Sequence, residues 1–191
     1  MTNFGEYTEL ALRTESTKLP LTEEVVIRGL SNRLFHSILG ISTEINEIYD
    51  AIEEKEFKDY DIVNILEEFG DMAWYLAIAC NERKLTIDYN DNKTSFFEIS
   101  NIRKGNSVIL DHCKKVMFYG KQLDDNLVDV TLVEIARLVF VSILALGGDI
   151  TNVLQANINK LKIRFPETFT DYHADNRELE TERNVLESSL N

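Results

Sequence analysis

The chain has 191 residues, which is enough for one well-buried core or for two halves of one compact domain. Its net charge of −13 excludes nucleic acid and anionic membranes as bulk partners, because no basic stretch compensates it. Only two prolines and eight glycines interrupt long stretches rich in Leu, Ile, Val, Glu and Lys, and this composition predicts an all-α protein.

Two helical runs are expected between Pro20 and Ile52. The first begins after Pro20, with Thr22 as its N-cap, and its apolar residues keep helical spacing. Gly40 is expected to kink or break this helix, after which a second run continues to Ile52.

A charged turn then leads to a third helix, which Asp61 caps and which ends near residues 81–84. The most loop-like run of the chain follows, and it indicates a linker at the midpoint. We therefore predict a single compact domain with four parts: a repeat with the metal carboxylates and an N-terminal arm (1–85), a linker (86–101), a second repeat (102–170) and a tail (171–191).

The second half repeats this plan. A helical face over residues 108–117 and a strongly apolar stretch over 132–146 predict two long helices, and a glycine pair ends the second. Asp149 or Thr151 then caps a shorter helix. The charged tail over residues 174–190 is expected to form a helix at the surface.

Two acidic motifs in the first half predict a metal site. They read Glu44-x-x-Glu47 and Glu68-x-x-Asp71, and on a helix residues three apart lie on one face. Two such helices side by side would bring four carboxylates together, an arrangement that persists only if cations separate them or the groups titrate unusually. Oxygen ligands without histidine or thiolate favour Mg²⁺ or Mn²⁺, and these metals suggest a phosphate substrate.

The two halves can be aligned, but the second half lacks most of the acids. Residues 67–74 match residues 133–140, so that Asp71 falls on Arg137 and only Glu134 retains a carboxylate. This alignment predicts a divergent internal repeat whose second copy cannot assemble a site with four carboxylates.

The acidic motifs resemble those of the MazG-like all-α nucleoside triphosphate pyrophosphohydrolases, a superfamily that includes dimeric dUTP and dCTP pyrophosphatases. The family pattern is Glu-Glu-x-x-Glu, a spacer, and then Glu-x-x-Asp, and here Thr43 takes the first position. Two later segments are also similar to the family. One carries Lys114 and Lys121 around a Phe-Tyr-Gly run, and the other reads Asn157-x-x-Lys160-Leu161-x-x-Arg164-Phe165-Pro166.

The resemblance implies an all-α helical bundle and, together with the repeat, an internally duplicated pseudo-dimer that acts as a monomer or as a homodimer. It implies hydrolysis of a nucleoside triphosphate to the monophosphate and pyrophosphate, with Mg²⁺ or, alternatively, Mn²⁺ as cofactor. The implied metal ligands are Glu44, Glu47, Glu68 and Asp71, with Glu44 or Glu47 as general base. The implied substrate-binding residues are Asn157, Lys160, Arg164, Lys114 and Lys121.

Other interpretations stay open. An isolated Glu-x-x-Glu on a helix is usually a solvated face, and Lys160 and Arg164 can simply form a basic helix end that complements the helix dipole. Trp74 is more typical of a core than of a binding site, and base recognition can fall to Trp74, Tyr119 or Asn157. The chain can also be a catalytically inactive nucleotide-binding or regulatory module of the same fold, or a helical scaffold.

The expected compartment is the cytoplasm. No apolar run approaches the roughly 18–20 residues that a membrane span needs, and the N-terminus lacks the apolar core of a signal peptide. Cys80 and Cys113 form no Cys-x-x-Cys motif and are best interpreted as small core residues in a reducing environment.

Overall fold

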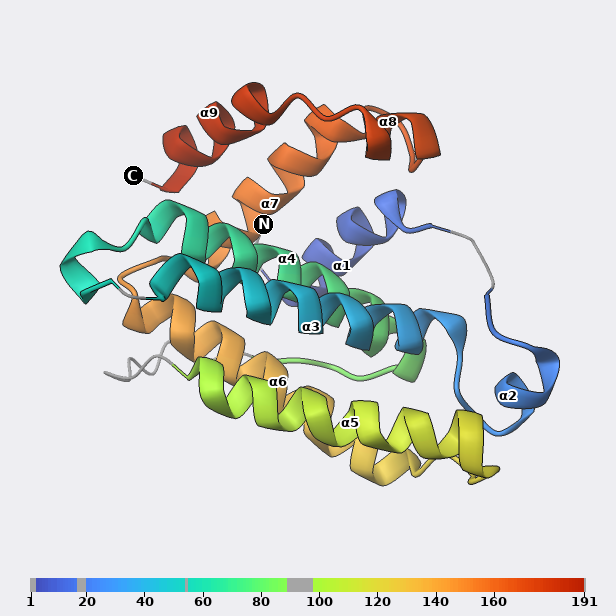
Figure 1. Cartoon of the computed structure of the whole chain (residues 1–191). Coiled ribbons are helices and arrows are strands. Elements are labelled where there is room, and N and C mark those ends of the chain that lie inside the picture. The colour runs from blue at the N-terminus through green and yellow to red at the C-terminus, as the bar shows by residue number, and fades with distance from the viewer. Residues whose placement is uncertain (1–2, 17–19, 54, 89–97, 191) are drawn as a thin grey trace.

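The computed structural model describes residues 3–16, 20–53, 55–88 and 98–190. Every regular element within these ranges is a helix, so the predicted all-α fold is confirmed (Figure 1). The elements are α1 (Phe4–Ala11), η1 (Leu12–Thr14), α2 (Glu23–Ile27), α3 (Asn32–Ile52), η2 (Phe57–Asp59), α4 (Ile62–Arg83), α5 (Ile99–Tyr119), α6 (Asp125–Ala145), α7 (Ile150–Arg164), α8 (Asp171–Asp175) and α9 (Leu179–Leu190).

Four long helices form the central bundle. Short connections join α3 to α4 and α5 to α6, and each pair packs as a helical hairpin; in addition α3 packs on α5 and α4 on α6 (Figure 1). The core arises because apolar residues recur at helical spacing on each inner face, as Leu34, Ile38, Ile41, Ile45 and Ile48 do in α3. Helices α1, α7 and α9 also pack on α4, so α4 is the most enclosed helix of the bundle.

Several helices begin with a side chain that accepts a backbone N–H, which satisfies a donor that has no partner within the helix. Asp61 caps α4, as predicted, by accepting from the amide of Asn64. Asp149 rather than Thr151 caps α7, since its carboxylate accepts from the amide of Asn152.

The expected single helix between Pro20 and Gly40 is wrong. The structure has the short α2, a break at Gly29, and then α3, which Ser31 caps. Gly29 has φ +95°, a conformation that side chains disfavour, and an added Cβ would lie 3.1 Å from Cβ of Leu123. The chain breaks there because the loop before α6 crosses it, with the Leu123 amide donating to the Arg28 carbonyl.

The expected kink at Gly40 is also wrong, because α3 runs through this position without interruption. Gly40 is instead a packing notch: a Cβ there would lie only 2.1 Å from Cζ of Tyr75 on α4. The glycine therefore allows the Tyr75 ring to approach the α3 backbone closely.

Two boundaries differ from the expected organisation. Helix α5 begins at Ile99, inside the stretch expected to be linker, and residues 89–97 of that stretch lie outside the described residues. The tail is helical as predicted, but it is not confined to the surface. Helix α9 packs on α7 and buries both Leu186 and Glu182.

The two hairpins have nearly equal helix lengths, with 21 and 22 residues in α3 and α4 and 21 residues in each of α5 and α6. This agreement is compatible with the expected repeat, whose common origin stays a prediction. Cys80 and Cys113 are both free and buried, as expected. Within the described ranges, no single helix combines the length and apolar character of a membrane span; α6 and α7 meet these criteria only as a pair bent by 102°.

Candidate functional site

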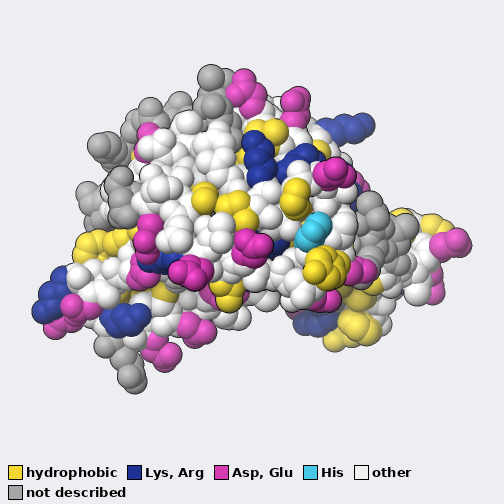
Figure 2. All heavy atoms as spheres, turned by 90° about the horizontal axis from the view of Figure 1, so that it is seen from above, with side chains coloured by type: hydrophobic (Ala, Val, Ile, Leu, Met, Phe, Trp, Pro, Cys, Tyr) yellow, Lys and Arg dark blue, Asp and Glu magenta, His cyan; other side chains and the backbone are white. Residues whose placement is uncertain are grey.

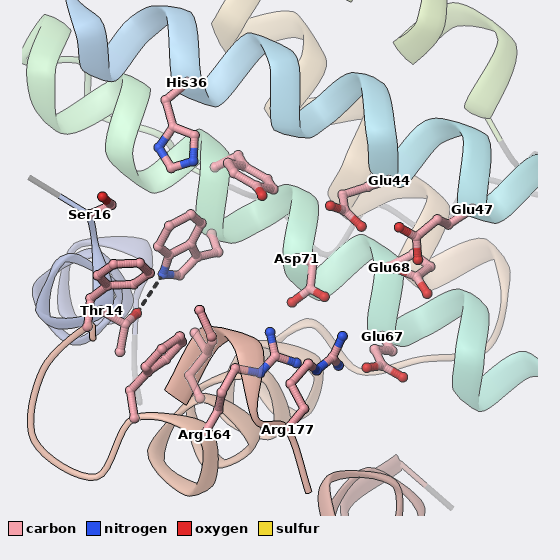
Figure 3. Close-up of a pocket in the computed structure, with 16 residues that line it drawn as sticks. Thr14, Ser16, His36, Glu44, Glu47, Glu67, Glu68, Asp71, Arg164 and Arg177 are labelled. Carbon is pink, nitrogen blue, oxygen red and sulfur yellow. Dashed lines mark hydrogen bonds between the residues drawn. The ribbon is translucent and has the colours of Figure 1, made fainter. Parts of the chain in front are cut away.

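A cavity of about 350 Å³ opens where α3 and α4 meet α7 and the segments that follow it. Its lining includes three groups of side chains: carboxylates, two arginines and a set of aromatic rings. Figure 3 shows the carboxylates toward one end, with His36, Ser16 and Thr14 toward the other and the two arginines below.

The carboxylate end contains all four acids that the motifs predicted. Glu44 and Glu47 project from α3, and Glu68 and Asp71 project from α4 (Figure 3). Three of them, Glu44, Glu68 and Asp71, each offer a ligand oxygen within 4.8 Å of the others. Glu47 is exposed at the edge of this triad, and Glu67 also lines the cavity. The three clustered carboxylates could hold a metal ion.

Burial makes this cluster costly while it carries no cation. Glu44 is 8 % exposed and Glu68 is 6 % exposed. Burial, reinforced by the nearby charge of Asp71, raises the pKa of Glu44 to about 7 and that of Glu68 to about 10. The two glutamates are also hydrogen-bonded to each other, which is possible only when one of them carries a proton. A cation that enters the cluster would replace that proton and remove the repulsion.

Two buried residues of α7, Asn157 and Lys160, donate hydrogen bonds to Asp71. Asn157 Nδ2 donates to Asp71 Oδ1 at 2.6 Å, and Lys160 Nζ donates to Asp71 Oδ2 at 2.5 Å and to Glu67 Oε1 at 3.1 Å. The Asn157 oxygen in turn accepts from the buried Tyr7 hydroxyl at 2.7 Å. Both Asp71 oxygens are thus fixed in direction by groups on another helix.

Neither Asn157 nor Lys160 lines the cavity, although both are substrate-binding residues in the sequence interpretation. Asn157 is 2 % exposed and Lys160 is fully buried, because α7 packs this face against α4. Burial alone would lower the pKa of Lys160, but the charges of Asp71 and Glu67 raise it above its usual value. The ammonium group therefore stays charged beneath the carboxylates.

Arg164 is the predicted substrate-binding residue that does line the cavity, and it is accompanied by Arg177. Both pair with Glu182 of α9, whose side chain is 2 % exposed. Burial alone would raise the pKa of Glu182, but the hydrogen bonds from Arg164 and Arg177 lower it to about 2. Figure 2 shows the face that carries α7 and α9, where basic and acidic side chains are interspersed, so these arginines are a local feature rather than part of a large basic surface.

The opposite end of the cavity is aromatic. It contains Trp74, Tyr75, Phe165 and Phe169, with His36 beside them. The rings of His36 and Tyr75 meet edge to face at 5.5 Å, and those of Phe165 and Phe169 lie 5.4 Å apart. The Trp74 indole donates to the Ala11 carbonyl at 3.0 Å, which fixes its ring. Burial lowers the pKa of His36, which favours its neutral form.

The remaining predicted residues lie elsewhere. Lys114 and Lys121 do not line the cavity; Lys114 is exposed on α5 and pairs with Asp111, and Lys121 is exposed in the turn after α5. Tyr119, one option for base recognition, is exposed at the end of α5 and does not line the cavity either.

Arg177 and Glu182 were absent from the predicted site. The only sequence signal for them was their place in the charged tail, and nothing there distinguishes them from neighbouring charges.

Known proteins neither support nor contradict this reading of the site. No protein-family model, no curated protein and no solved structure matches the chain. Any assignment of function therefore depends on the residues that line the cavity.

Proposed function

We propose that this protein is a Mg²⁺-dependent nucleoside triphosphate pyrophosphohydrolase. The proposal rests on one observation: a single cavity combines clustered buried carboxylates, two arginines and a set of aromatic rings. These three groups correspond to the three chemical parts of a metal nucleotide, which are the cation, the phosphates and the base. The two acidic motifs and the segment from Asn157 to Pro166 resemble those of the family, and this resemblance supports the same assignment.

The donor set fits a hard divalent cation. Glu44, Glu68 and Asp71 offer only oxygen ligands, with no thiolate or imidazole among them, and this is the preference of Mg²⁺ and Mn²⁺. Glu47 lines the same cavity and its charge acts on Glu44 and Glu68, so we assign it as a further ligand or as the general base. When bound, the cation would offset negative charge on the phosphate oxygens and would lower the pKa of a water molecule bound to it.

In the proposed reaction, the oxygen of a water molecule forms a bond to the α-phosphorus while the bond from that phosphorus to the bridging oxygen breaks. Pyrophosphate leaves with the bonding electrons, and a proton of the water passes to Glu44 or Glu47. Lys160 and Asn157 orient Asp71 through both of its oxygens, so we assign them a supporting role. Arg164 and Arg177 take phosphate oxygens, and the aromatic end takes the base by stacking.

The direct test is pyrophosphate release from a panel of ribonucleoside and deoxyribonucleoside triphosphates in the presence of Mg²⁺. We expect turnover by the wild-type protein and its loss in Glu68→Gln, which keeps the shape of the side chain. The matched control is Glu134→Gln, because Glu134 aligns with Glu68 but is exposed and paired with Arg137. Absence of turnover across the whole panel, or full activity in Glu68→Gln, would refute the proposal.

The second candidate is an inactive nucleotide-binding module of the same fold, and Thr43 favours it. Where the family pattern has an acid, the Thr43 hydroxyl lies 2.7 Å from the Gly40 carbonyl and 3.1 Å from Glu44 Oε1, and adds no carboxylate. This candidate predicts a rise in melting temperature with nucleotide and Mg²⁺ but no pyrophosphate, since a ligand that binds only the folded state stabilises it.

A further inference from the structure

The two arginines of the cavity share one carboxylate. Arg164 donates to Glu182 through Nε at 3.0 Å and through Nη2 at 2.5 Å, and Arg177 donates to the same side chain through Nη2 at 2.8 Å. Glu182 lies in the first turn of α9 and does not line the cavity. The carboxylate therefore binds both guanidinium groups without itself lining the cavity.

Binding to Glu182 leaves donors on both arginines for a second partner. A guanidinium group has five N–H donors on three nitrogens, and Arg164 uses two of its nitrogens for Glu182. Its Nη1, and two nitrogens of Arg177, are not engaged by Glu182. Because both groups are anchored to one point, these remaining donors are held at a fixed separation, which suits oxygens of neighbouring phosphates.

The cavity contains a competitor for these arginines. The charges of Asp71 and Glu67 act on Arg164, and Figure 3 shows both carboxylates near the arginines. Without a carboxylate behind it, a long flexible arginine would turn toward these acids and neutralise them. An anchor on α9 keeps the arginines apart from the carboxylate cluster, so that both remain available to different parts of a ligand.

We propose that Glu182 is a positioning residue, which holds Arg164 and Arg177 in place to bind the phosphates of the substrate, and that α9 is thereby part of the substrate site. This inference rests on the proposed function for the identity of the substrate. Glu182 touches neither the substrate nor the metal and acts only through the two arginines.

Binding of inorganic tripolyphosphate with Mg²⁺, followed by calorimetry, tests this without any turnover. Loss of a charge-assisted anchor is expected to weaken the affinity of Glu182→Gln roughly tenfold to a hundredfold. In hydrolysis assays the same variant should raise KM by a similar factor with a smaller change in kcat. The matched control is Glu187→Gln, since Glu187 lies on the same helix, pairs with Arg183 away from the cavity lining, and should leave both quantities unchanged.

The same substitution in a background that lacks both arginines tests whether Glu182 acts only through them. In an Arg164→Ala, Arg177→Ala background, Glu182→Gln should have no further effect on tripolyphosphate affinity, because it has nothing left to position. If Glu182→Gln proves unstable, Arg177→Gln replaces an exposed side chain and should still weaken binding several-fold.

Three results would overturn the inference: unchanged tripolyphosphate affinity in Glu182→Gln, tighter binding in that variant, or no binding by the wild-type protein. Tighter binding would mean that Glu182 competes with phosphate instead of positioning its ligands. Failure of the proposed function alone would give a different result. Tripolyphosphate would still bind in a way that depends on Glu182, but no nucleotide would release pyrophosphate.

Discussion

The two helical hairpins of the bundle are alike in length but differ in the surroundings of their acidic side chains. In the α3–α4 hairpin, Glu44, Glu68 and Asp71 are gathered at a cavity, and Glu44 and Glu68 are buried. In the α5–α6 hairpin, the aligned Glu134 is exposed and pairs with Arg137 three residues along the same helix. The same kind of hairpin therefore supports either a buried acidic cluster or an ordinary solvated face.

The difference arises from the helices outside the hairpins. Helix α7 packs on α4 and brings the buried Lys160 and Asn157 against Asp71, and α9 adds Glu182, which anchors two arginines. Buried carboxylates persist only when hydrogen bonds and opposite charges compensate them, and here another helix supplies these groups. The acids of the α3–α4 hairpin thus form a buried cluster because helices outside the hairpin pack against them.

The largest expected effect is on cation binding. Asp71→Asn removes one of the three clustered oxygen ligands and should weaken Mn²⁺ binding, followed by electron paramagnetic resonance, on the order of 100-fold or more. The matched substitution in the second hairpin, Arg137→Asn, should leave Mn²⁺ affinity unchanged. Equal effects of the two substitutions would mean that the hairpins do not differ in the way described.

The second effect concerns the support of the cluster by α7. Lys160→Met removes the buried ammonium group that pairs with Asp71 and Glu67, so we expect a loss of about 3–5 kcal/mol in the free energy of unfolding. Urea denaturation measures this value. Lys114→Met, which removes an exposed lysine from the second hairpin, should leave stability nearly unchanged. A small loss in Lys160→Met would show that Lys160 is not needed to compensate the acids.

A third effect compares a glycine in each hairpin. Gly40→Ala places a methyl group 2.1 Å from the Tyr75 ring, and such overpacking is expected to cost about 1–3 kcal/mol. In Gly105→Ala the nearest atom, Cγ1 of Ile135, is 3.0 Å away on a side chain that can shift, and the better helix propensity of alanine offsets part of the strain. Thermal denaturation should therefore rank Gly40→Ala well below Gly105→Ala. If Gly40→Ala were the more stable variant, Gly40 would not be needed to make room for the Tyr75 ring.

Helical spacing was sufficient to predict that Glu44, Glu68 and Asp71 gather at one place, because they follow the period of a helix on two helices that pack together. It did not show that Glu47 lies at the exposed edge of this cluster. It was not sufficient to predict the roles of Lys160 and Asn157. Spacing places both on one face of α7 but does not say whether that face meets a ligand or another helix.

Glu182 was beyond prediction for a different reason. It is one of 33 acidic residues, and its importance depends on contacts with Arg164 and Arg177 that only the packing of α9 creates. The function of Gly40 was similarly hidden, because the residue that needs the space is Tyr75, 35 positions later on a neighbouring helix. Local patterns thus identify the acids that gather, whereas the groups that support them depend on tertiary packing.

A further expected effect is on the pH dependence of stability, and the direction of that dependence differs between the aligned residues Glu68 and Glu134. Without divalent cations, the pKa of Glu68 rises from its usual 4.5 to about 10 on folding, so the folded state holds a proton that the unfolded state has lost. Glu68 then contributes stability below pH 4.5, and this contribution is lost as the pH rises toward about 10. Arg137 lowers the pKa of Glu134 by hydrogen bonding, so Glu134 contributes stability at neutral pH that is lost as the pH falls through its lowered pKa.

Denaturation in EDTA across this pH range separates the two residues. Glu68→Gln should flatten the fall in stability above pH 4.5, and Mg²⁺ should have the same effect on the wild-type protein, because a bound cation replaces the proton. Glu134→Gln should leave the fall in stability above pH 4.5 unchanged and reduce only the loss of stability under acid conditions. If Glu68→Gln and wild-type protein show parallel curves in EDTA, the carboxylate at position 68 is not held in the protonated, buried state on which the difference between the hairpins depends.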